Sequence, residues 1–184
     1  MQIGQRYYLI VDLEATCSQD ATVPREEMEI IEIGAVMVNA QTFEEESDFQ
    51  TFVRPVRHPQ LTSFCLELTG IRPADVADAP AFREAIDKMK EWMEGFEDPL
   101  FCSWGDYDRK QFRQDCQYHQ VAYPFGAEHL NLKAEFARSL GQQKQIGIGQ
   151  ALKRLGLQFE GSPHRGLDDA RNIARIVRHV CVGA

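Results

Sequence analysis

The sequence lacks the cysteine pairs from which zinc sites and disulfide frameworks are built. Its five cysteines, an odd number, are scattered along the chain, and no two of them form a Cys-x-x-Cys pair. A zinc site or a disulfide framework is therefore not expected. The pattern favours small buried side chains in a reducing compartment, so we expect a cytoplasmic protein.

Long apolar runs are also missing. No stretch approaches the ~20 residues that a membrane span requires, and the first residues, MQIGQRYYLIV, lack the layout of a secretory signal. We expect no contact with a membrane. Repeats, low-complexity tracts and linkers are absent as well, so the 184 residues are predicted to form one domain, residues 1–184, with a well-buried core.

Basic residues are in the minority: 20 Lys and Arg stand against 28 Asp and Glu, which gives a formal net charge of −8. Proteins that bind nucleic acids are usually basic, so this balance at first counts against such a function. The objection weakens if several acids converge on bound cations, because a metal ion inverts the local field. The arrangement of the acids therefore decides more than their number.

The hydrophobic pattern predicts a sheet covered by helices. The apolar run RYYLIV (6–11) is typical of a strand buried on both faces, 29–40 is again strand-like, and 42–55 alternates as an antiparallel strand with one wet face would. Further along we expect a helix over 78–96, a short buried strand over 99–104, and helices over 108–120, 132–140, 149–156 and 166–181. This order indicates a mixed sheet.

Acidic residues stand in three places where burial would normally exclude them. Asp12 and Glu14 follow the first strand two residues apart, so their side chains point the same way. Unpaired, they would repel each other and resist ionisation. Capping does not explain acids at the end of a strand.

The two other acidic places lie at helix starts. One is WGDYDRKQF, with Asp106 and Asp108, and the other is HRGLDDARNIARI, with His164, Asp168 and Asp169. Taken singly, such acids are often simple first-turn residues that favour the helix dipole, and a lone histidine is more often an ordinary surface residue. However, strand ends and adjacent helix starts are also where α/β sheets bind ligands.

Together, DLEATC, WGDYDRKQF and HRGLDDARNIARI resemble, in order, the three motifs of the DEDDh family of 3′→5′ exonucleases. The segment LTSFCLELTGI (61–71) is similar to the branch that contains the eukaryotic 3′ histone-mRNA exonuclease and its bacterial relatives. The resemblance extends from about residue 6 to residue 180. It implies an α/β, RNase H-like fold, with a five-stranded mixed sheet flanked by helices on both faces.

The resemblance also implies a catalytic set of four metal-ligating carboxylates and one general base: Asp12, Glu14, Asp108, Asp169 and, as the base, His164. Asp108 is preferred to Asp106 because GDYD aligns with the glycine–x–aromatic–aspartate of the family. Asp169 is preferred to Asp168 because the family spaces the histidine and the aspartate by five residues.

Four carboxylates cannot all stay ionised in a half-buried cleft unless cations compensate them. Two divalent cations, Mg²⁺ or Mn²⁺, would do so and would hold the attacking and leaving oxygens of a phosphodiester. Oxygen-only ligands select such hard cations and disfavour zinc.

The resemblance implies that the terminal base is flanked by Phe64, Leu68 and Tyr107, and Leu13 is a further apolar candidate. Phe64 and Leu68 could equally be core residues under a turn. The expected substrate is a single-stranded 3′ end, with RNA favoured over DNA by the branch and nucleoside 5′-monophosphates as the product. The alternatives are a DNA-directed repair or proofreading exonuclease and a regulatory nucleic-acid-binding module without activity.

Overall fold

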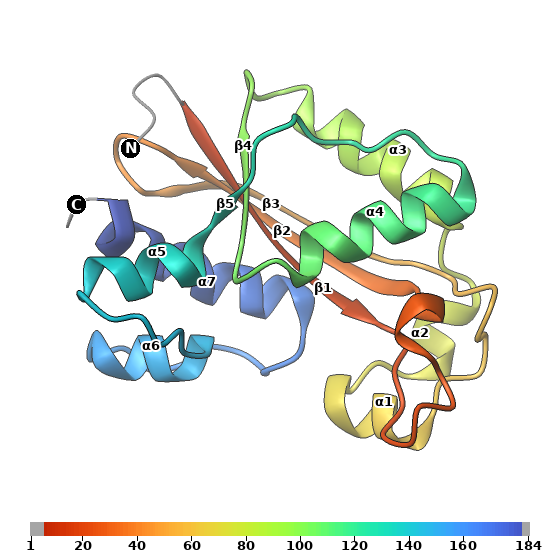
Figure 1. The fold of residues 1–184 in the computed structure, drawn as a ribbon. Helices are drawn as coiled ribbons and strands as arrows, with labels where there is room; N and C mark the ends of the chain where they lie inside the picture. Colours follow the sequence, from red (N-terminus) through yellow and green to blue (C-terminus); the bar gives the residue numbers. More distant parts are fainter. Residues whose placement is uncertain (1–5, 182–184) are drawn as a thin grey trace.

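The computed structural model describes residues 6–181, and its centre is a five-stranded sheet in the order β3-β2-β1-β4-β5 (Figure 1). The strands are β1 (Tyr7–Ala15), β2 (Ile30–Asn39), β3 (Glu45–Phe52), β4 (Leu100–Ser103) and β5 (Leu130–Asn131). β1, β2 and β3 pair antiparallel, whereas β4 and β5 continue the sheet in parallel from β1. The predicted mixed sheet is confirmed.

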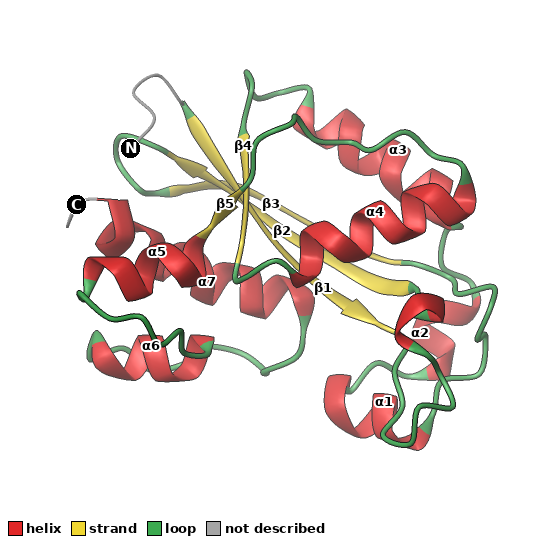
Figure 2. Ribbon diagram, in the orientation of Figure 1, coloured by secondary structure: helices red, strands yellow, loops and turns green. Residues whose placement is uncertain are grey.

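Helices cover both faces of this sheet (Figure 2). α3 (Phe82–Met93) and α4 (Tyr107–His119) pack on one face, and α5 (Leu132–Ser139) and α7 (Gly166–Cys181) pack on the other. α6 (Ile148–Arg154) packs against α7. Among the residues described, no helix has both the length and the apolar character needed to cross a membrane.

Three short helices were not predicted as helices. They are η1, a 3-10 helix (Arg25–Glu27), α1 (Ser63–Thr69) and α2 (Pro73–Ala77). They have only three to seven residues, too few to repeat an apolar stripe over several turns. α1 is defined by its ends instead: the Thr62 hydroxyl accepts a hydrogen bond from the Cys65 backbone N–H, and Gly70 ends the helix with a φ of 67°. The two-residue strand β5 was missed for the same reason.

The alternation of side chains along β1 decides where its acids point. Tyr8 and Ile10 belong to the core cluster under α7, whereas Leu9 and Val11 belong to the cluster under α3 and α4. Asp12 and Glu14 continue the series of Tyr8 and Ile10, because strand residues two apart share a face. Both carboxylates are therefore carried on the α7 side of the sheet.

A close backbone contact places α7 on this side. Gly34 of β2 lies opposite Asp12 in the β1–β2 ladder. A Cβ atom added at Gly34 would lie 2.0 Å from the carbonyl carbon of Gly166, the first residue of α7. One added at Gly166 would lie 3.0 Å from the backbone oxygen of Asp12. Glycine at these positions lets the start of α7 rest directly on the strands.

We expect Gly34→Ala to lower the free energy of unfolding by about 1–3 kcal/mol, the usual cost of overpacking a well-packed site. The reason is that the added methyl group would push α7 away from the sheet. Urea denaturation measures the change. Gly149→Ala is the matched control, because a Cβ there meets no atom within 4 Å. If both variants unfold alike, the contact between Gly34 and Gly166 is not the constraint described.

Candidate active site

Three carboxylates converge where β1 ends against the first turn of α7. Oxygen atoms of Asp12, Glu14 and Asp169 all lie within 4.8 Å of one another. Glu14 and Asp169 are each only 7% exposed, and Asp12 is partly buried. The fold thus brings Asp169 beside the two acids of β1, although more than 150 residues separate it from them in the sequence.

A fourth carboxylate reaches the same place from the other face of the sheet. Asp108, in the first turn of α4, is 4% exposed. Its Oδ1 accepts a hydrogen bond of 3.1 Å from the backbone N–H of Leu13, the residue between the two acids of β1. This bond ties α4 to the end of β1 and directs Asp108 toward the cluster.

The neighbouring acids of both motifs are engaged elsewhere. Asp106 precedes α4 and forms an ion pair of 2.8 Å with Arg109. Asp168 accepts a hydrogen bond of 2.9 Å from the backbone N–H of Ser162. Neither of them lines the cavity that Asp108 and Asp169 share with the acids of β1.

Burial and mutual repulsion make the ionised form of the clustered carboxylates unfavourable. Desolvation, followed by repulsion from neighbouring acids, raises the pKa of Glu14 to about 9. The same two causes hold the pKa of Asp12 well above its usual range. Desolvation also raises the pKa of both Asp108 and Asp169 to about 6, although backbone hydrogen bonds to each carboxylate oppose the increase.

This charge distribution fits a bound divalent cation. The four carboxylates offer only oxygen donors, which hard cations such as Mg²⁺, Mn²⁺ and Ca²⁺ prefer. A cation among them would remove the repulsion that raises their pKa values. The chemistry of these residues therefore fits a divalent metal ion.

His164 lies at the edge of the cluster and is exposed. Its backbone has a left-handed φ of 62°, and its N–H donates a hydrogen bond of 2.7 Å to Oδ2 of Asp169. That bond uses the backbone and leaves the imidazole free to meet a ligand. The histidine is thus fixed by its main chain beside the acids.

The pair of Glu32 and Arg165 supports the segment that carries His164. Glu32, in β2, is fully buried. Its carboxylate accepts two hydrogen bonds from the Arg165 guanidinium, at 3.1 and 3.2 Å, and one of 3.1 Å from the backbone N–H of Gly166. Sequence reasoning assigned Glu32 no role, because a single acid inside an apolar strand gives no sign of its partner.

The acids and His164 line one cavity of about 300 Å³. Three of the four residues expected around a substrate base, Leu13, Leu68 and Tyr107, also line it. Phe64 lies on α1 with Leu68 and is partly exposed, but it does not line the cavity. Its role in substrate binding stays a prediction.

Several lining residues were not identified from the sequence: Ala15, Cys17, Met28, Trp104 and Ile148. Met28 and Ile148 come from loops and helices far from the three motifs, so no local pattern marks them. Trp104 did have a signal, since it is the first residue of the second motif, WGDYDRKQF. Its indole N–H donates to the Ile146 carbonyl at 3.0 Å and so holds the segment before α6 near the site.

Comparisons with known proteins agree with this geometry. Residues 9–177 match the RNase_T family model, described as an exonuclease. The chain is 39% identical over 180 residues to ERI1 exoribonuclease 3 from Homo sapiens, covering 94% of this chain and 52% of that protein. It is 35% identical over 179 residues to 3′-5′ exoribonuclease 1 from Homo sapiens, covering 92% and 51%. The chain spans about half the length of these curated relatives.

Solved structures show the same fold. The nuclease domain of 3′hExo, described as a DEDDh family member bound to rAMP, aligns with a TM-score of 0.88 and 34% identity over 95% of this chain and 90% of that one. A 3′-exonuclease in a structure of histone mRNA stem-loop recognition aligns with a TM-score of 0.90 and 33% identity over 98% and 65%. These likenesses confirm the expected RNase H-like architecture.

The raised pKa values predict an unusual pH dependence for the metal-free protein. The pKa of Glu14 is about 9 in the folded state, against an ordinary pKa of 4.5. The contribution of Glu14 to stability is therefore fully present below pH 4.5 and is lost as the pH rises from 4.5 to about 9. Such a group lowers the free energy of unfolding by up to about 1.4 kcal/mol per pH unit. Urea denaturation in EDTA between pH 6 and pH 8 should show this decline.

Glu14→Gln should decline less steeply over that range than the wild type, because its side chain does not titrate. Glu91→Gln, an exposed change on α3, serves as the control and should keep the wild-type slope. If the slope of Glu14→Gln equals that of the wild type, the Glu14 carboxyl does not carry the repulsion described.

Proposed function

Since the chain belongs to the exonuclease family whose model matches residues 9–177, we propose that it is a metal-dependent 3′→5′ exonuclease acting on single-stranded RNA. The observation that carries this proposal is the convergence of four carboxylates and His164 on one cavity. RNA is favoured because relatives at 35–39% identity are named exoribonucleases. The five free cysteines support a reducing compartment such as the cytoplasm.

Asp12, Glu14, Asp108 and Asp169 would hold two divalent cations, Mg²⁺ or Mn²⁺, whose charge would stabilise the phosphodiester oxygens and acidify the attacking water. The protein contributes the placement of these ligands. The Leu13 N–H fixes the orientation of Asp108, and the His164 N–H fixes that of Asp169. Neither acid must reorganise when the substrate arrives.

His164 would act as the general base that accepts a proton from the attacking water. Its imidazole is exposed at the cavity, whereas its backbone is held by Asp169. A positioned base of this kind can take the proton as the oxygen attacks phosphorus and the bond to the 3′ oxygen breaks. The product is then a nucleoside 5′-monophosphate and an RNA shortened by one residue.

The cavity explains why the reaction would begin at an end of the strand. Its volume of about 300 Å³ is at the small end of the range for ligand sites. Leu13, Leu68 and Tyr107 form apolar walls beside the acids, and we propose that they hold the terminal base, with Phe64 at the outer side. Stacking on such walls contributes about 1–3 kcal/mol per base.

The proposed function is tested with single-stranded RNA and DNA oligonucleotides labelled at the 5′ or the 3′ end, incubated with Mg²⁺, Mn²⁺ or EDTA. We expect 5′-labelled RNA to shorten one nucleotide at a time, and the 3′ label to appear at once as a mononucleotide. EDTA should stop both. Products from DNA alone would indicate a repair exonuclease, and no product with either metal would indicate a binding module.

We expect His164→Ala to reduce kcat by about 10²–10⁴, the usual contribution of a positioned acid or base, while Mn²⁺ binding measured by calorimetry stays near that of the wild type. The reason is that the imidazole accepts a proton and does not ligate the metal. His179→Ala, at an exposed position in the last turn of α7, is the matched control and should keep full activity. Near-normal turnover in His164→Ala would show that another group is the base.

A further inference from the structure

Arg25, outside the three motifs, is stacked on one of the cavity residues. Its guanidinium carbon lies 4.7 Å from the ring centroid of Tyr107. Tyr107 lines the cavity, whereas Arg25 does not. The Tyr107 ring therefore joins the cavity to a guanidinium that lies outside it.

We propose that Arg25 is a substrate-positioning residue that acts through Tyr107. It holds the ring in place and adds its charge to a three-layer stack of guanidinium, tyrosine and 3′-terminal base. This inference rests on the proposed function, because it needs a nucleotide in the cavity. Arginine suits the role, since its planar, weakly hydrated group stacks well on an aromatic face.

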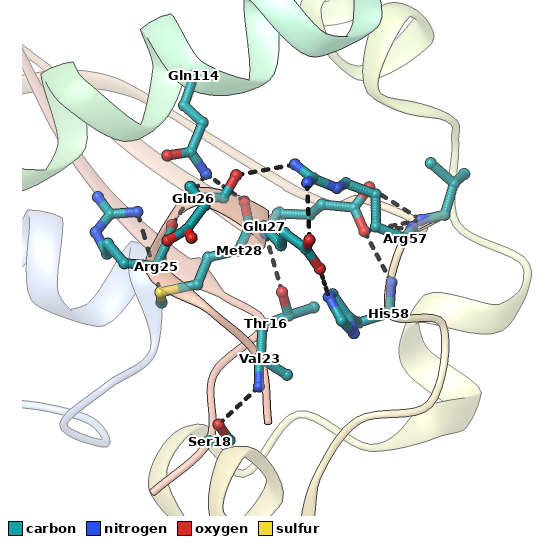
Figure 3. Close-up of polar contacts among 12 residues, drawn as sticks. Thr16, Ser18, Val23, Arg25, Glu26, Glu27, Met28, Arg57, His58 and Gln114 are labelled. Carbon is teal, nitrogen blue, oxygen red and sulfur yellow. Dashed lines mark hydrogen bonds and ion pairs between the residues drawn. The ribbon is translucent and has the colours of Figure 1, made fainter. Parts of the chain in front are cut away.

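The contacts of Arg25 with α4 explain why an exposed arginine keeps this position. Its Nη1 donates a hydrogen bond of 2.5 Å to Oε1 of Gln111. The Gln114 amide donates to the carbonyl oxygens of Arg25 and Met28, at 3.2 and 2.8 Å (Figure 3). Both glutamines belong to the helix that begins with Tyr107. One helix thus carries the ring and restrains the cation over it.

The opposite side of η1 is held as well (Figure 3). The Arg57 guanidinium donates to the Glu26 carbonyl at 3.0 Å, and the His58 imidazole lies 2.9 Å from the Glu27 carboxylate. Upstream, Val23 is buried and its N–H donates to the Ser18 hydroxyl at 2.9 Å. η1 is therefore clamped between α4 and the loop at 56–58, which fixes the backbone of Arg25.

The guanidinium of Arg25 has no carboxylate partner among the residues that the structure describes. Within residues 6–181, no acidic side chain lies within ion-pair distance of it, in contrast to Arg165 and Arg171. Its close partners are a neutral amide and an aromatic face. An unpaired cation could instead bind an RNA phosphate directly. The stack is favoured, because Gln111 already holds one edge of the guanidinium and the ring occupies its face.

The experiment compares two RNA oligonucleotides that differ only in the 3′-terminal nucleotide, which is either intact or abasic. For Arg25→Ala we expect KM on the intact oligonucleotide to rise about three- to tenfold, in line with a partly desolvated cation–π contact, with kcat changed less than twofold. On the abasic oligonucleotide the variant should equal the wild type. Arg25→Lys, which keeps the charge but not the plane, should restore part of the loss.

Arg113→Ala is the matched control, because Arg113 also stacks on a tyrosine of this chain, Tyr123, at 5.4 Å, and Tyr123 does not line the cavity. It should leave KM unchanged. An equal loss for Arg25→Ala on both oligonucleotides would indicate a phosphate contact and overturn the proposal, as would an unchanged KM. A lowered melting temperature with equal loss on both would show a purely structural role. If the wild type degrades neither oligonucleotide, the proposed function itself fails.

Discussion

The contact between the backbones of β2 and α7 at Gly34 and Gly166 is the constraint on which the acidic site depends. Gly34 stands opposite Asp12 in the ladder, so the start of α7 meets the sheet beside the first site residue. One turn later along α7 comes Asp169, which therefore faces the pair on β1. A side chain at either glycine would separate the helix from the strand and spread the carboxylates apart.

The cluster that results opposes folding, and the rest of the molecule offsets it. Burial and mutual repulsion raise the pKa of every carboxylate in the cluster, so ionising them costs stability in the absence of a cation. Two apolar cores, one under α7 and one under α3 and α4, supply the opposing stabilisation. The backbone hydrogen bonds from Leu13 and His164 offset part of the cost as well, because they stabilise the ionised carboxylates of Asp108 and Asp169. Such strain is expected of a site arranged for its ligand before the ligand binds.

The parts of this structure that the sequence predicted are those with a period or a motif. β1 was marked by an apolar run and by the motif that contains Asp12 and Glu14, and α7 by a stripe of apolar residues beside its acids. What could not be predicted lies in short segments whose partners are remote in the chain. η1 has three residues and takes its position from Gln111, Gln114 and the loop at 56–58, so no local pattern describes it. The cavity contacts of Met28 and Ile148 and the partners of Glu32 likewise exist only after the chain has folded.

The net charge of −8 must be reconciled with the polyanionic substrate of the proposed function, because the arginines near the site do not line its cavity. Arg165 is paired with the buried Glu32, and Arg25 is stacked on the ring of Tyr107. Neither occupies the cavity, whose ionisable lining is dominated by acids. Under the proposed function, the positive charge that meets a phosphodiester directly would come from the divalent cations held by the carboxylates. Without those cations the cavity would repel a nucleic acid. The proposed function therefore implies that metal binding and substrate binding are coupled, with an RNA end attracted only after the acids have been neutralised.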